Sequence, residues 1–562
     1  MCGIAGVVAT DGADAAPALR LMLDAMRHRG PDGAGYWVGN RVSRAKHVNE
    51  LDWEQAHGPI ALGHTRLAVV GGPMGSQPFV CDSGPVSLLH NGEIYNYQEL
   101  RPGLETGHTF TTSTDSEVLA HLIGDLYTGD LTEAVEAALM QCDGVYAVAV
   151  TDGQQVVIGR DLVGVRQLYV GKKEQFFVFA SEKKALWALG IEAGIQRLLP
   201  GELSTVSPAG ILTRRRDPAG LIPDHIASED PVESRRDYGR SLEAAVAKRI
   251  QNQERVGIIF SGGVDSVLIA QVAKRLGANI TCYSAGHADS SDLHHAITMA
   301  RGLGMELRPV DLTEGAVMDL IPEVIQVIED RSTGQVEVAI PVFAAVRAAQ
   351  HDGQIVLLTG QAADELFGGY PWYRVIVERE GYAQFQFRMQ DDLLQLYKET
   401  LEREDKITMA HSIELRVPYL DPGVITTAMS IAPQLKVLGG DDVLGKHVHR
   451  ELAVEMGIPE EWAMRPKEAA QHGAGVHDLL DGLARQHGFN PQVAERVGYS
   501  VEDNVAEQLG SSARYGYRYS DPQMWEPQGH VQLFLDWVAY ENDLLNKADR
   551  ATTKEFLTGV RS

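Results

Sequence analysis

The chain has 562 residues, of which 44% are hydrophobic, and a formal net charge of −26. This length allows large buried cores and predicts more than one domain, while the acidic excess disfavours nucleic-acid partners, which require a basic surface. No apolar run approaches the length of a membrane-spanning helix and no signal-peptide pattern opens the chain, so we expect a cytoplasmic protein without a membrane partner.

The chain opens M-C-G-I-A-G, with Cys2 directly after Met1. Removal of Met1 would leave a thiol and an α-amine on one residue, and an amine with a pKa of about 8 is partly neutral at cellular pH and accepts the thiol proton. Cys2 would then be a self-contained nucleophile. A buried structural cysteine is the alternative, because free cysteines are among the most buried residue types.

Four motifs follow in order: R-H-R-G-P-D-G (27–33), G-H-T-R-L-A-V-V (63–70), N-G-E-I-Y-N-Y (91–97) and S-T-D-S-E (113–117). Two more are R-D-L-V-G-V-R-Q-L-Y (160–169) and F-A-S-E-K-K-A-L (179–186). With Cys2, this series resembles the N-terminal-nucleophile glutaminase domain of glutamine amidotransferases. The resemblance implies an α+β sandwich of two antiparallel sheets with flanking helices over residues 1–205.

A glutamine substrate carries an α-carboxylate, an α-ammonium group and an amide, so its site needs a cation, an anion and an oxyanion hole. The resemblance implies that Arg66 binds the carboxylate, Asp115 binds the ammonium group and Glu93 helps to hold the amino acid. The ordinary alternatives are a surface charge for Arg66 and a helix N-cap for Asp115.

The resemblance also assigns the oxyanion hole to the Asn91 side chain and the Gly92 backbone N–H. Cys2 would attack the glutamine amide, release ammonia and leave a thioester for water to hydrolyse. Asn-Gly is also a common hairpin-turn dipeptide, which is the alternative interpretation of this pair.

Three prolines and many charges mark R-R-R-D-P-A-G-L-I-P-D-H-I-A-S-E-D-P (214–231), and we assign residues 206–236 to a linker. A helix from Asp237 to Ile250 is predicted to open a second domain over 237–475. Its alternating strands and helices predict an α/β fold with a parallel sheet.

The apolar segment 256–260 predicts a buried strand, and the small residues Ser261, Gly262 and Gly263 separate it from a predicted helix. Such a loop presents backbone N–H groups to a phosphate, although an ordinary strand-to-helix turn is the alternative. The pattern S-G-G-x-D-S is narrow and resembles the pyrophosphate loop of the N-type ATP pyrophosphatases. These enzymes cleave ATP between its α and β phosphates.

The resemblance implies that Ser266 and the loop bind pyrophosphate while Asp265 and Asp364 bind Mg²⁺. Asp364 lies in I-V-L-L-T-G-Q-A-A-D-E-L-F-G-G-Y (355–370), a second predicted strand that leads into a small-residue loop. Ligands of parallel sheets gather at such strand ends. Adenine would lie against backbone at Ala285, within 284–286, and at Gly360, and the resemblance also assigns Gln361 to the ATP site.

The segment G-D-D-V-L-G-K-H (440–447) nearly spells a Walker A loop. His447 replaces the Ser or Thr that would bind Mg²⁺, and no apolar strand precedes the segment. We therefore predict an ordinary turn that leads into a helix near Asp442.

A glutaminase followed by a pyrophosphatase domain resembles the class B, glutamine-hydrolysing asparagine synthetases. The motifs H-S-I-E-L-R-V-P-Y-L-D (411–421) and R-P-K-E-A-A-Q-H-G (465–473) extend the resemblance to residues 1–475. It implies a carbon–nitrogen ligase in which aspartate attacks ATP to give an acyl adenylate, Lys467 offsets phosphate charge, and ammonia travels through an internal tunnel to displace AMP.

Gln361 departs from the best-known synthetases, which carry Glu at this position. A glutamine side chain accepts no proton, so another group or water must do so, and Glu365 is one option. The acceptor therefore stays open: aspartate is favoured, and a different carboxylic acid in specialised metabolism, with ammonia or a related nitrogen nucleophile, is the alternative. A non-catalytic regulator is disfavoured because the motif residues are intact.

We assign residues 476–562, which match no motif, to a helical C-terminal extension that could shape the acceptor site. Its segment R-Y-G-Y-R-Y-S-D-P-Q-M-W (514–525) has a composition that can stack on bases, although a packed turn or an oligomer contact is favoured. A later helix is predicted to place five apolar residues on one face: Val531, Phe534, Leu535, Val538 and Leu545. The oligomeric state stays open, with a homodimer among the options.

The four cysteines, at positions 2, 81, 142 and 282, are too few and too scattered to predict a disulfide framework or a Cys-based zinc site. His294 and His295 form no ligand spacing with another Cys or His, so we interpret them as surface residues.

Overall fold

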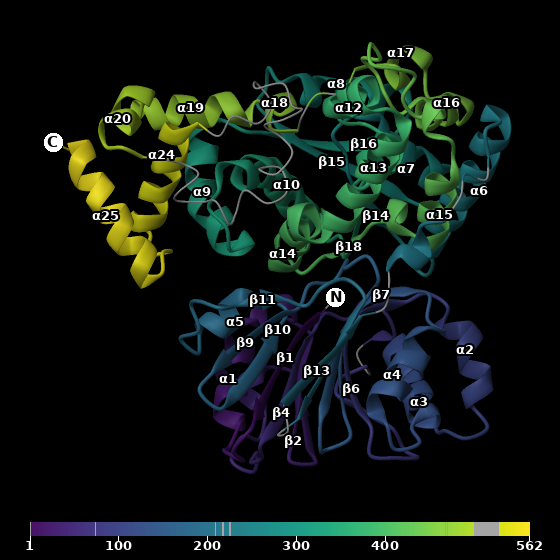
Figure 1. Cartoon of the computed structure of the whole chain (residues 1–562), viewed down its shortest axis with the longest axis vertical. Helices are drawn as coiled ribbons and strands as arrows, with labels where there is room; N and C mark the ends of the chain where they lie inside the picture. The colour runs from purple at the N-terminus through teal and green to yellow at the C-terminus, as the bar shows by residue number, and fades with distance from the viewer. Residues whose placement is uncertain are drawn as a thin grey trace. The chain divides into compact units, whose positions relative to one another are not determined.

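The computed structural model describes residues 2–72, 75–207, 210–215, 218–223, 226, 228–466, 468, 470–499 and 528–561. The chain divides into two compact units, Met1–Pro218 and Ala219–Ser562 (Figure 1). Within the described ranges, no helix has both the length and the apolar character needed to cross a bilayer.

Unit 1 contains two antiparallel sheets, with strand orders β11-β9-β10-β1-β4-β2-β3 and β13-β12-β8-β7-β6-β5. The strands of the first sheet are, in that order, Gln196–Arg197, Tyr169–Lys173, Phe176–Ala180, Cys2–Ala9, Ile60–Arg66, Gly33–Val38 and Arg41–Ala45. Those of the second are Gly210–Arg215, Glu202–Ser207, Val156–Arg160, Gly144–Thr151, Ser87–Ile94 and Phe79–Val80. Strand β13 thus lies inside the range 206–236 that the sequence analysis assigned to a linker.

Helices cover the outer faces of the two sheets of unit 1. Helices α1 (Ala16–Ala25) and α5 (Lys183–Trp187) pack on the first sheet, and α2 (Tyr97–Leu104), α3 (Asp115–Leu126) and α4 (Leu131–Leu139) lie beside the second (Figure 1). A core shared by both sheets fills the space between them, including Ile4, Val8, Leu62, Leu89, Ala147 and Ile158. The predicted sandwich with flanking helices is confirmed.

Unit 2 is built on a parallel sheet of order β16-β15-β14-β17-β18. Its strands are Glu306–Asp311, Ile280–Gly286, Val256–Ile259, Val356–Leu358 and Glu414–Arg416. Helices pack against this sheet, among them α7 (Val264–Arg275), α8 (Ser291–Gly302) and α10 (Thr333–His351). The predicted parallel-sheet domain is confirmed.

Unit 2 contains further helices. They are α6 Pro231–Ile250, α9 Glu314–Ile328, α11 Ala363–Phe367, α12 Pro371–Glu380, α13 Tyr382–Leu396, α14 Glu402–Ala410, α15 Pro422–Ser430, α16 His447–Glu455, α17 Glu460–Ala463, α18 Ala470–Gly473, α19 Val476–Gln486, α20 Pro491–Arg496, α24 Gly529–Glu541 and α25 Lys547–Arg561.

Two predicted helix starts were wrong. Helix α6 begins at Pro231 rather than Asp237, because the Asp230 carboxylate accepts the N–H groups of residues 232 and 233 and proline suits the first helical position. Helix α16 begins at His447 rather than near Asp442. The Asp442 carboxylate instead accepts backbone N–H groups of residues 444 and 445, which closes a turn ahead of the helix.

The C-terminal part of the chain is helical in its described residues, as predicted. Helix α24 buries the predicted residues Val531, Phe534, Leu535 and Val538 and packs against α9, α10 and α19. Leu545 does not share this face, because α24 ends at Glu541. The Arg331 guanidinium lies 2.9 Å from Asp536 of this helix, which ties the C-terminal part to the rest of unit 2. The segment 514–525 lies outside the described residues.

Candidate active sites

Cys2 of the first sheet of unit 1 contacts Asn91 of the second sheet. Cys2 begins β1, and its backbone N–H donates to Asn91 Oδ1 at 2.8 Å. The Asn91 Nδ2 has no hydrogen-bond partner among the described residues, so this donor remains available. The thiol is 3.9 Å from the Leu67 carbonyl oxygen, and Cys2 is only 8% exposed. The predicted nucleophile and the predicted oxyanion donor are therefore in direct contact.

Gly92 lies in the middle of β6, as does Asn91, so the hairpin-turn alternative for this pair is wrong. A Cβ atom at Gly92 would lie 2.0 Å from the Val145 carbonyl oxygen of β7. Only glycine allows this approach of the two strands. Glu93 follows in the same strand and is buried.

Arg66 ends β4 directly opposite Cys2 in the first sheet. It is buried, and its Nη2 donates to the Gly72 carbonyl at 2.5 Å, whereas Nη1 has no hydrogen-bond partner among the described residues. Burial lowers the pKa of Arg66, and the nearby Cys2, Asp32 and Asp115 act in the opposite direction. The surface-charge alternative for Arg66 is therefore wrong.

Asp115 is the first residue of α3 and is buried. Its Oδ2 accepts the Ile94 backbone N–H at 2.9 Å, which joins α3 to the end of β6. The N-cap of α3 is Thr114, whose side chain accepts the Glu117 N–H, so the N-cap alternative for Asp115 is wrong. The six residues predicted for glutamine chemistry in unit 1 thus come from three strands, β1, β4 and β6, and from the start of α3.

A buried ion pair that the sequence analysis did not single out supports Cys2. Arg29 donates from Nε to the Cys2 carbonyl at 3.1 Å and from Nη1 to Glu182 Oε1 at 2.7 Å, and both side chains are fully buried. Although burial alone raises it, the cations Lys184, His28 and Arg29 hold the pKa of Glu182 well below its usual range. Arg29 lies in the motif 27–33 and Glu182 lies in the motif 179–186. These two motifs therefore supply the ion pair that contacts the start of β1.

We expect Glu182→Ala to destabilise the start of β1, because it leaves Arg29 buried without its carboxylate, a change that typically costs about 3–5 kcal/mol. Hydrogen exchange of the β1 amides should accelerate. Arg27→Ala is the control, since the Arg27–Asp24 pair is exposed and such pairs contribute about 0–1 kcal/mol. Equal exchange rates in Glu182→Ala and wild type would contradict the assigned role.

In unit 2, the loop Ser261–Gly263 joins β14 to α7. Gly262 has φ +73°, and a Cβ there would lie 2.7 Å from the Ala296 backbone nitrogen. Ser266 donates from its hydroxyl to the Gly263 carbonyl at 3.2 Å, which closes the loop on the helix. Among the described residues, no side chain caps α7 at Gly263, so its first N–H groups can receive a phosphate.

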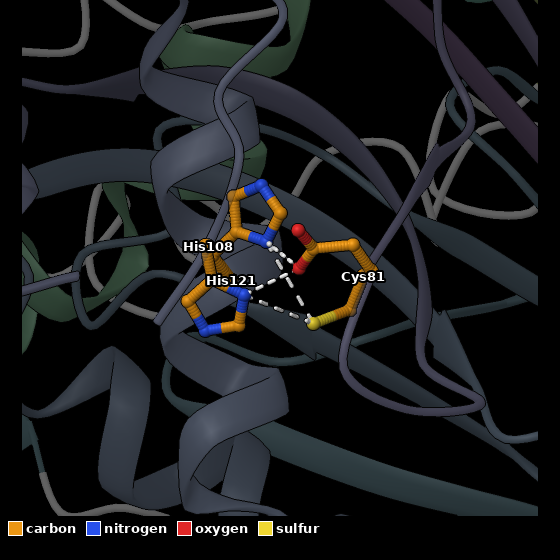
Figure 2. A group of neighbouring side chains, drawn as sticks. Cys81, His108 and His121 are labelled. Carbon is orange, nitrogen blue, oxygen red and sulfur yellow. Dashed lines mark hydrogen bonds and ion pairs between the residues drawn. The ribbon is translucent and has the colours of Figure 1, made fainter. Parts of the chain in front are cut away.

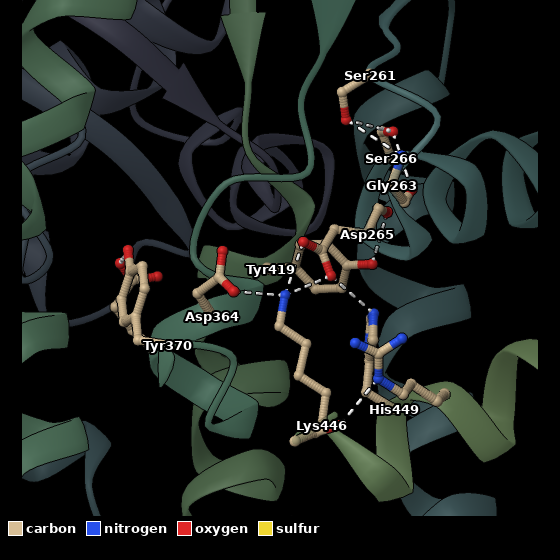
Figure 3. Close-up of polar contacts among 12 residues, drawn as sticks. Ser261, Gly263, Asp265, Ser266, Asp364, Tyr370, Tyr419, Lys446 and His449 are labelled. Carbon is tan, nitrogen blue, oxygen red and sulfur yellow. Dashed lines mark hydrogen bonds and ion pairs between the residues drawn. The ribbon is translucent and has the colours of Figure 1, made fainter. Parts of the chain in front are cut away.

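The two predicted metal ligands, Asp265 and Asp364, converge on a third residue, Lys446 (Figure 3). The Lys446 Nζ lies 2.7 and 2.8 Å from the two Asp265 oxygens and 2.7 Å from Asp364 Oδ1. Both carboxylates therefore already face a single positive charge. Two carboxylates at one point form the oxygen-donor set that Mg²⁺ prefers, so these residues fit a magnesium site.

Two glycines allow this convergence. A Cβ at Gly369 would lie 1.9 Å from Asp364 Oδ1 and 2.1 Å from Lys446 Cε, so a larger residue would separate the pair. A Cβ at Gly360 would lie 2.9 Å from the Ser266 nitrogen, which places the loop after β17 directly against the start of α7.

Histidine and tyrosine side chains contact Asp265 and fix its position. His449 Nε2 lies 3.1 Å from Asp265 Oδ1, and its Nδ1 lies 2.8 Å from the Tyr238 hydroxyl. Tyr419, from the motif 411–421, donates its hydroxyl to the Asp265 carbonyl at 2.9 Å. Burial lowers the pKa of His449, so a neutral imidazole stands beside the carboxylate.

Gln361 is hydrogen-bonded to a buried carboxylate from α14. Its Nε2 donates to Glu404 Oε1, and the Thr359 hydroxyl lies 3.5 Å from Glu404 Oε2. Burial raises the pKa of Glu404 to about 6. Glu365, bonded by the Tyr370 hydroxyl, has its pKa raised to about 8 by burial and by the Asp364 charge.

The remaining predicted residues are distributed as follows. Ala285 is buried near the end of β15, and Lys467 lies outside the described residues. Sequence reasoning missed Lys446, which lies in the dismissed segment 440–447, and also His449 and Glu404. The signal in the sequence that could have identified Lys446 is its place in a segment that nearly matches a phosphate-binding motif. Nothing in the local pattern distinguishes Glu404 from other helix charges.

Comparison with known proteins places both units in one family. A glutamine amidotransferase domain model matches residues 1–199, and an asparagine synthase model matches residues 237–384 and 377–539. The chain belongs to the glutamine-hydrolysing asparagine synthetase family. As a member of this family it is a carbon–nitrogen ligase with glutamine as amide-nitrogen donor. The second match continues to residue 539 and so includes α19, α20 and most of α24.

Three relatives support the assignment over nearly their full lengths. A putative glutamine-hydrolysing asparagine synthetase 1 from Methanocaldococcus jannaschii is 33% identical over 537 residues, covering 87% of this chain and 96% of the relative. Asparagine synthetase of Sandersonia aurantiaca is 29% identical, with 95% and 96% covered. Asparagine synthetase B of Escherichia coli is 28% identical, with 95% and 91% covered.

Proposed function

We propose that this protein converts aspartate to asparagine with glutamine as nitrogen donor, and cleaves ATP to AMP and pyrophosphate with Mg²⁺ bound. The observation that carries the proposal is that one chain brings together two groups of side chains, each suited to one of these reactions. Cys2 with Asn91, Arg66 and Asp115 suits amide hydrolysis, and Asp265 with Asp364 and Lys446 beside the Ser261–Gly263 loop suits ATP cleavage.

The first reaction takes place at Cys2. After removal of Met1, the α-amine accepts the thiol proton and the sulfur attacks the glutamine amide carbon. Asn91 Nδ2 and the Gly92 N–H stabilise the negative oxygen of the tetrahedral intermediate, while Arg66 and Asp115 hold the substrate ends. Ammonia leaves, and water then cleaves the thioester to give glutamate.

The second reaction activates the acceptor. An aspartate carboxylate oxygen attacks the α-phosphorus of ATP, and pyrophosphate departs toward the loop Ser261–Gly263 and the start of α7. Asp265 and Asp364 would hold Mg²⁺, which would supply positive charge to the phosphate oxygens. Lys446 and Lys467 add further positive charge.

The third reaction forms the amide. Ammonia bonds to the carbonyl carbon of the acyl adenylate, loses a proton and expels AMP. Glu365, with a pKa of about 8, is protonated near neutral pH and is a poor acceptor. Glu404, with a pKa of about 6, is mostly ionised at that pH, and Gln361 holds it at the loop before Asp364. We therefore propose that Glu404 accepts the proton that the attacking ammonia loses.

Glu404→Gln is expected to slow asparagine formation by about 10²- to 10⁴-fold, the usual contribution of a general base. Aspartate-dependent exchange of pyrophosphate into ATP should persist, because it precedes amide formation. In wild type, the glutamine-driven rate should fall as pH drops below about 6, since Glu404 must be ionised to accept a proton. That acidic limb should be lost in the variant.

The matched control is the double substitution Glu404→Gln with Gln361→Glu. It returns a carboxylate to the same hydrogen bond from the other side and should restore a large part of the rate. Unchanged amide formation in Glu404→Gln would exclude this residue as the base.

A different carboxylic acid acceptor is the second candidate, and Gln361 is the observation that favours it. The test is pyrophosphate release with ATP, Mg²⁺ and glutamine, first with aspartate and then with a panel of carboxylic acids. Release that depends on aspartate and yields asparagine supports the main proposal. Release with another acid alone moves the assignment to that acid.

A further inference from the structure

Unit 1 contains a cluster of four side chains that the glutaminase chemistry does not use (Figure 2). Cys81 and Asp82 follow β5, His108 follows α2, and His121 lies in α3. One ligand atom from each residue lies within 4.8 Å of all the others. We propose that this cluster binds one Zn²⁺ ion, held by Cys81 Sγ, Asp82 Oδ1 and the Nδ1 atoms of His108 and His121.

Three distances between ligand atoms are close to those of a tetrahedral zinc site, whereas Asp82 and His108 stand at hydrogen-bond distance. Zinc bonds of about 2.0–2.3 Å place neighbouring ligand atoms roughly 3.3–3.6 Å apart. Cys81 Sγ lies 3.7 Å from His121 Nδ1 and 3.9 Å from His108 Nδ1. Asp82 Oδ1 lies 3.5 Å from His121 Nδ1 and 2.5 Å from His108 Nδ1. Zinc would replace the hydrogen bond between Asp82 Oδ1 and His108 Nδ1, and these two atoms would move apart by about 1 Å.

Asp125 provides an independent indication. It lies one turn beyond His121 in α3, and its Oδ1 is 2.7 Å from His108 Nε2, the ring nitrogen that faces away from the cluster. A histidine that binds zinc usually donates its other N–H to a carboxylate, which fixes the ring and its tautomer. The order Asp125–His108–cluster reproduces this arrangement.

An ion pair between His108 and the two aspartates is the ordinary explanation. It accounts for Asp82 and Asp125 but not for the other two side chains. His121 stacks on His108 with ring centroids 4.3 Å apart and directs Nδ1 at the thiol, and its Nε2 has no hydrogen-bond partner among the described residues. Two imidazoles and a thiol around one carboxylate oxygen are better explained by a shared cation.

The neighbouring helix α3 leaves room for the Cys81 thiol. A Cβ atom at position 124 would lie 2.2 Å from Cys81 Sγ, so Gly124 gives the sulfur its place beside α3. Cys81, His108 and His121 are buried, while Asp82 is exposed and leaves a path for the ion.

The ligand set selects the metal. One thiolate and two imidazoles suit Zn²⁺ and disfavour Mg²⁺ and Ca²⁺, which prefer oxygen donors. Binding releases the Cys81 thiol proton to solvent, and no redox step is involved. Four protein ligands leave no open position, so the site is structural. It ties the connection after β5 to α3, the helix that begins at Asp115.

The test is zinc analysis of the full-length protein, followed by Co²⁺ titration of chelator-treated protein. We expect about one zinc per chain and, with Co²⁺, a thiolate-to-metal charge-transfer band. Cys81→Ser should lose the band, and His108→Ala should lose zinc. Cys142→Ser and Cys2→Ala are matched controls that should keep both, because neither thiol belongs to the cluster.

Wild-type protein that takes up neither zinc nor cobalt would overturn the proposal, as would a charge-transfer band that survives in Cys81→Ser. Hydrogen exchange gives a second readout that does not depend on a variant that folds. Chelation of wild type should accelerate exchange in α3 and in residues 81–86, and zinc should reverse this. None of these measurements depends on the enzyme reaction, so they test the zinc site independently of the proposed function.

Discussion

The Cys2→Ala variant should lose glutamine-driven amide formation to below about a thousandth of wild type, because removal of a nucleophile eliminates the covalent step. Activity with ammonium salts should remain, because Cys2 takes no part in acceptor activation. The measurement is product formation with each nitrogen source at equal ATP and acceptor concentrations.

Cys142→Ala serves as the matched control. Its thiol lies in unit 1, 3.2 Å from the Ala138 carbonyl, and it is not one of the residues predicted to act on glutamine, so both nitrogen sources should remain effective. Equal loss of both activities in Cys2→Ala would contradict the division of labour between two sites.

The Asp265→Asn variant is expected to lose the ATP-dependent step whichever nitrogen source is present. The substitution removes one of the two carboxylates that face Lys446 and would hold Mg²⁺. Loss of several kcal/mol of charge stabilisation corresponds to on the order of 10²- to 10³-fold in rate. Aspartate-dependent pyrophosphate exchange is the direct measurement.

Glutamine hydrolysis provides the internal control for this variant. It should continue in Asp265→Asn, since Cys2 and its partners lie in unit 1. Asp319→Asn, at an exposed position of α9, should leave both reactions unchanged. Pyrophosphate exchange that survives in Asp265→Asn would remove Asp265 from the ATP site.

The sequence analysis predicted both folds because their strongest signals are local. The apolar strand before Ser261 and the small residues after it describe one strand, loop and helix in a row, and the structure shows that unit. The glutaminase motifs likewise lie at β1, β4, β6 and the start of α3, where Cys2, Arg66, Asn91 and Asp115 are found.

The missed residues depend on contacts between distant segments. Lys446 reaches Asp265 across 181 positions, and Glu404 reaches Gln361 across 43. Cys81 meets His121 across 40 positions, so no ligand spacing is visible in the chain. Two predicted helix boundaries were wrong for local reasons. The Asp230 carboxylate caps α6, so this helix begins before Asp237, and α24 ends before Leu545.

The central claim is that glutamine nitrogen is joined to an ATP-activated carboxylate. Its most direct test supplies amide-¹⁵N-labelled glutamine, aspartate, ATP and Mg²⁺ and measures labelled asparagine, AMP and pyrophosphate together. We predict labelled asparagine in equal amounts with AMP and pyrophosphate. Glutamate formation without any labelled asparagine, at saturating aspartate and ATP, would contradict aspartate as the acceptor.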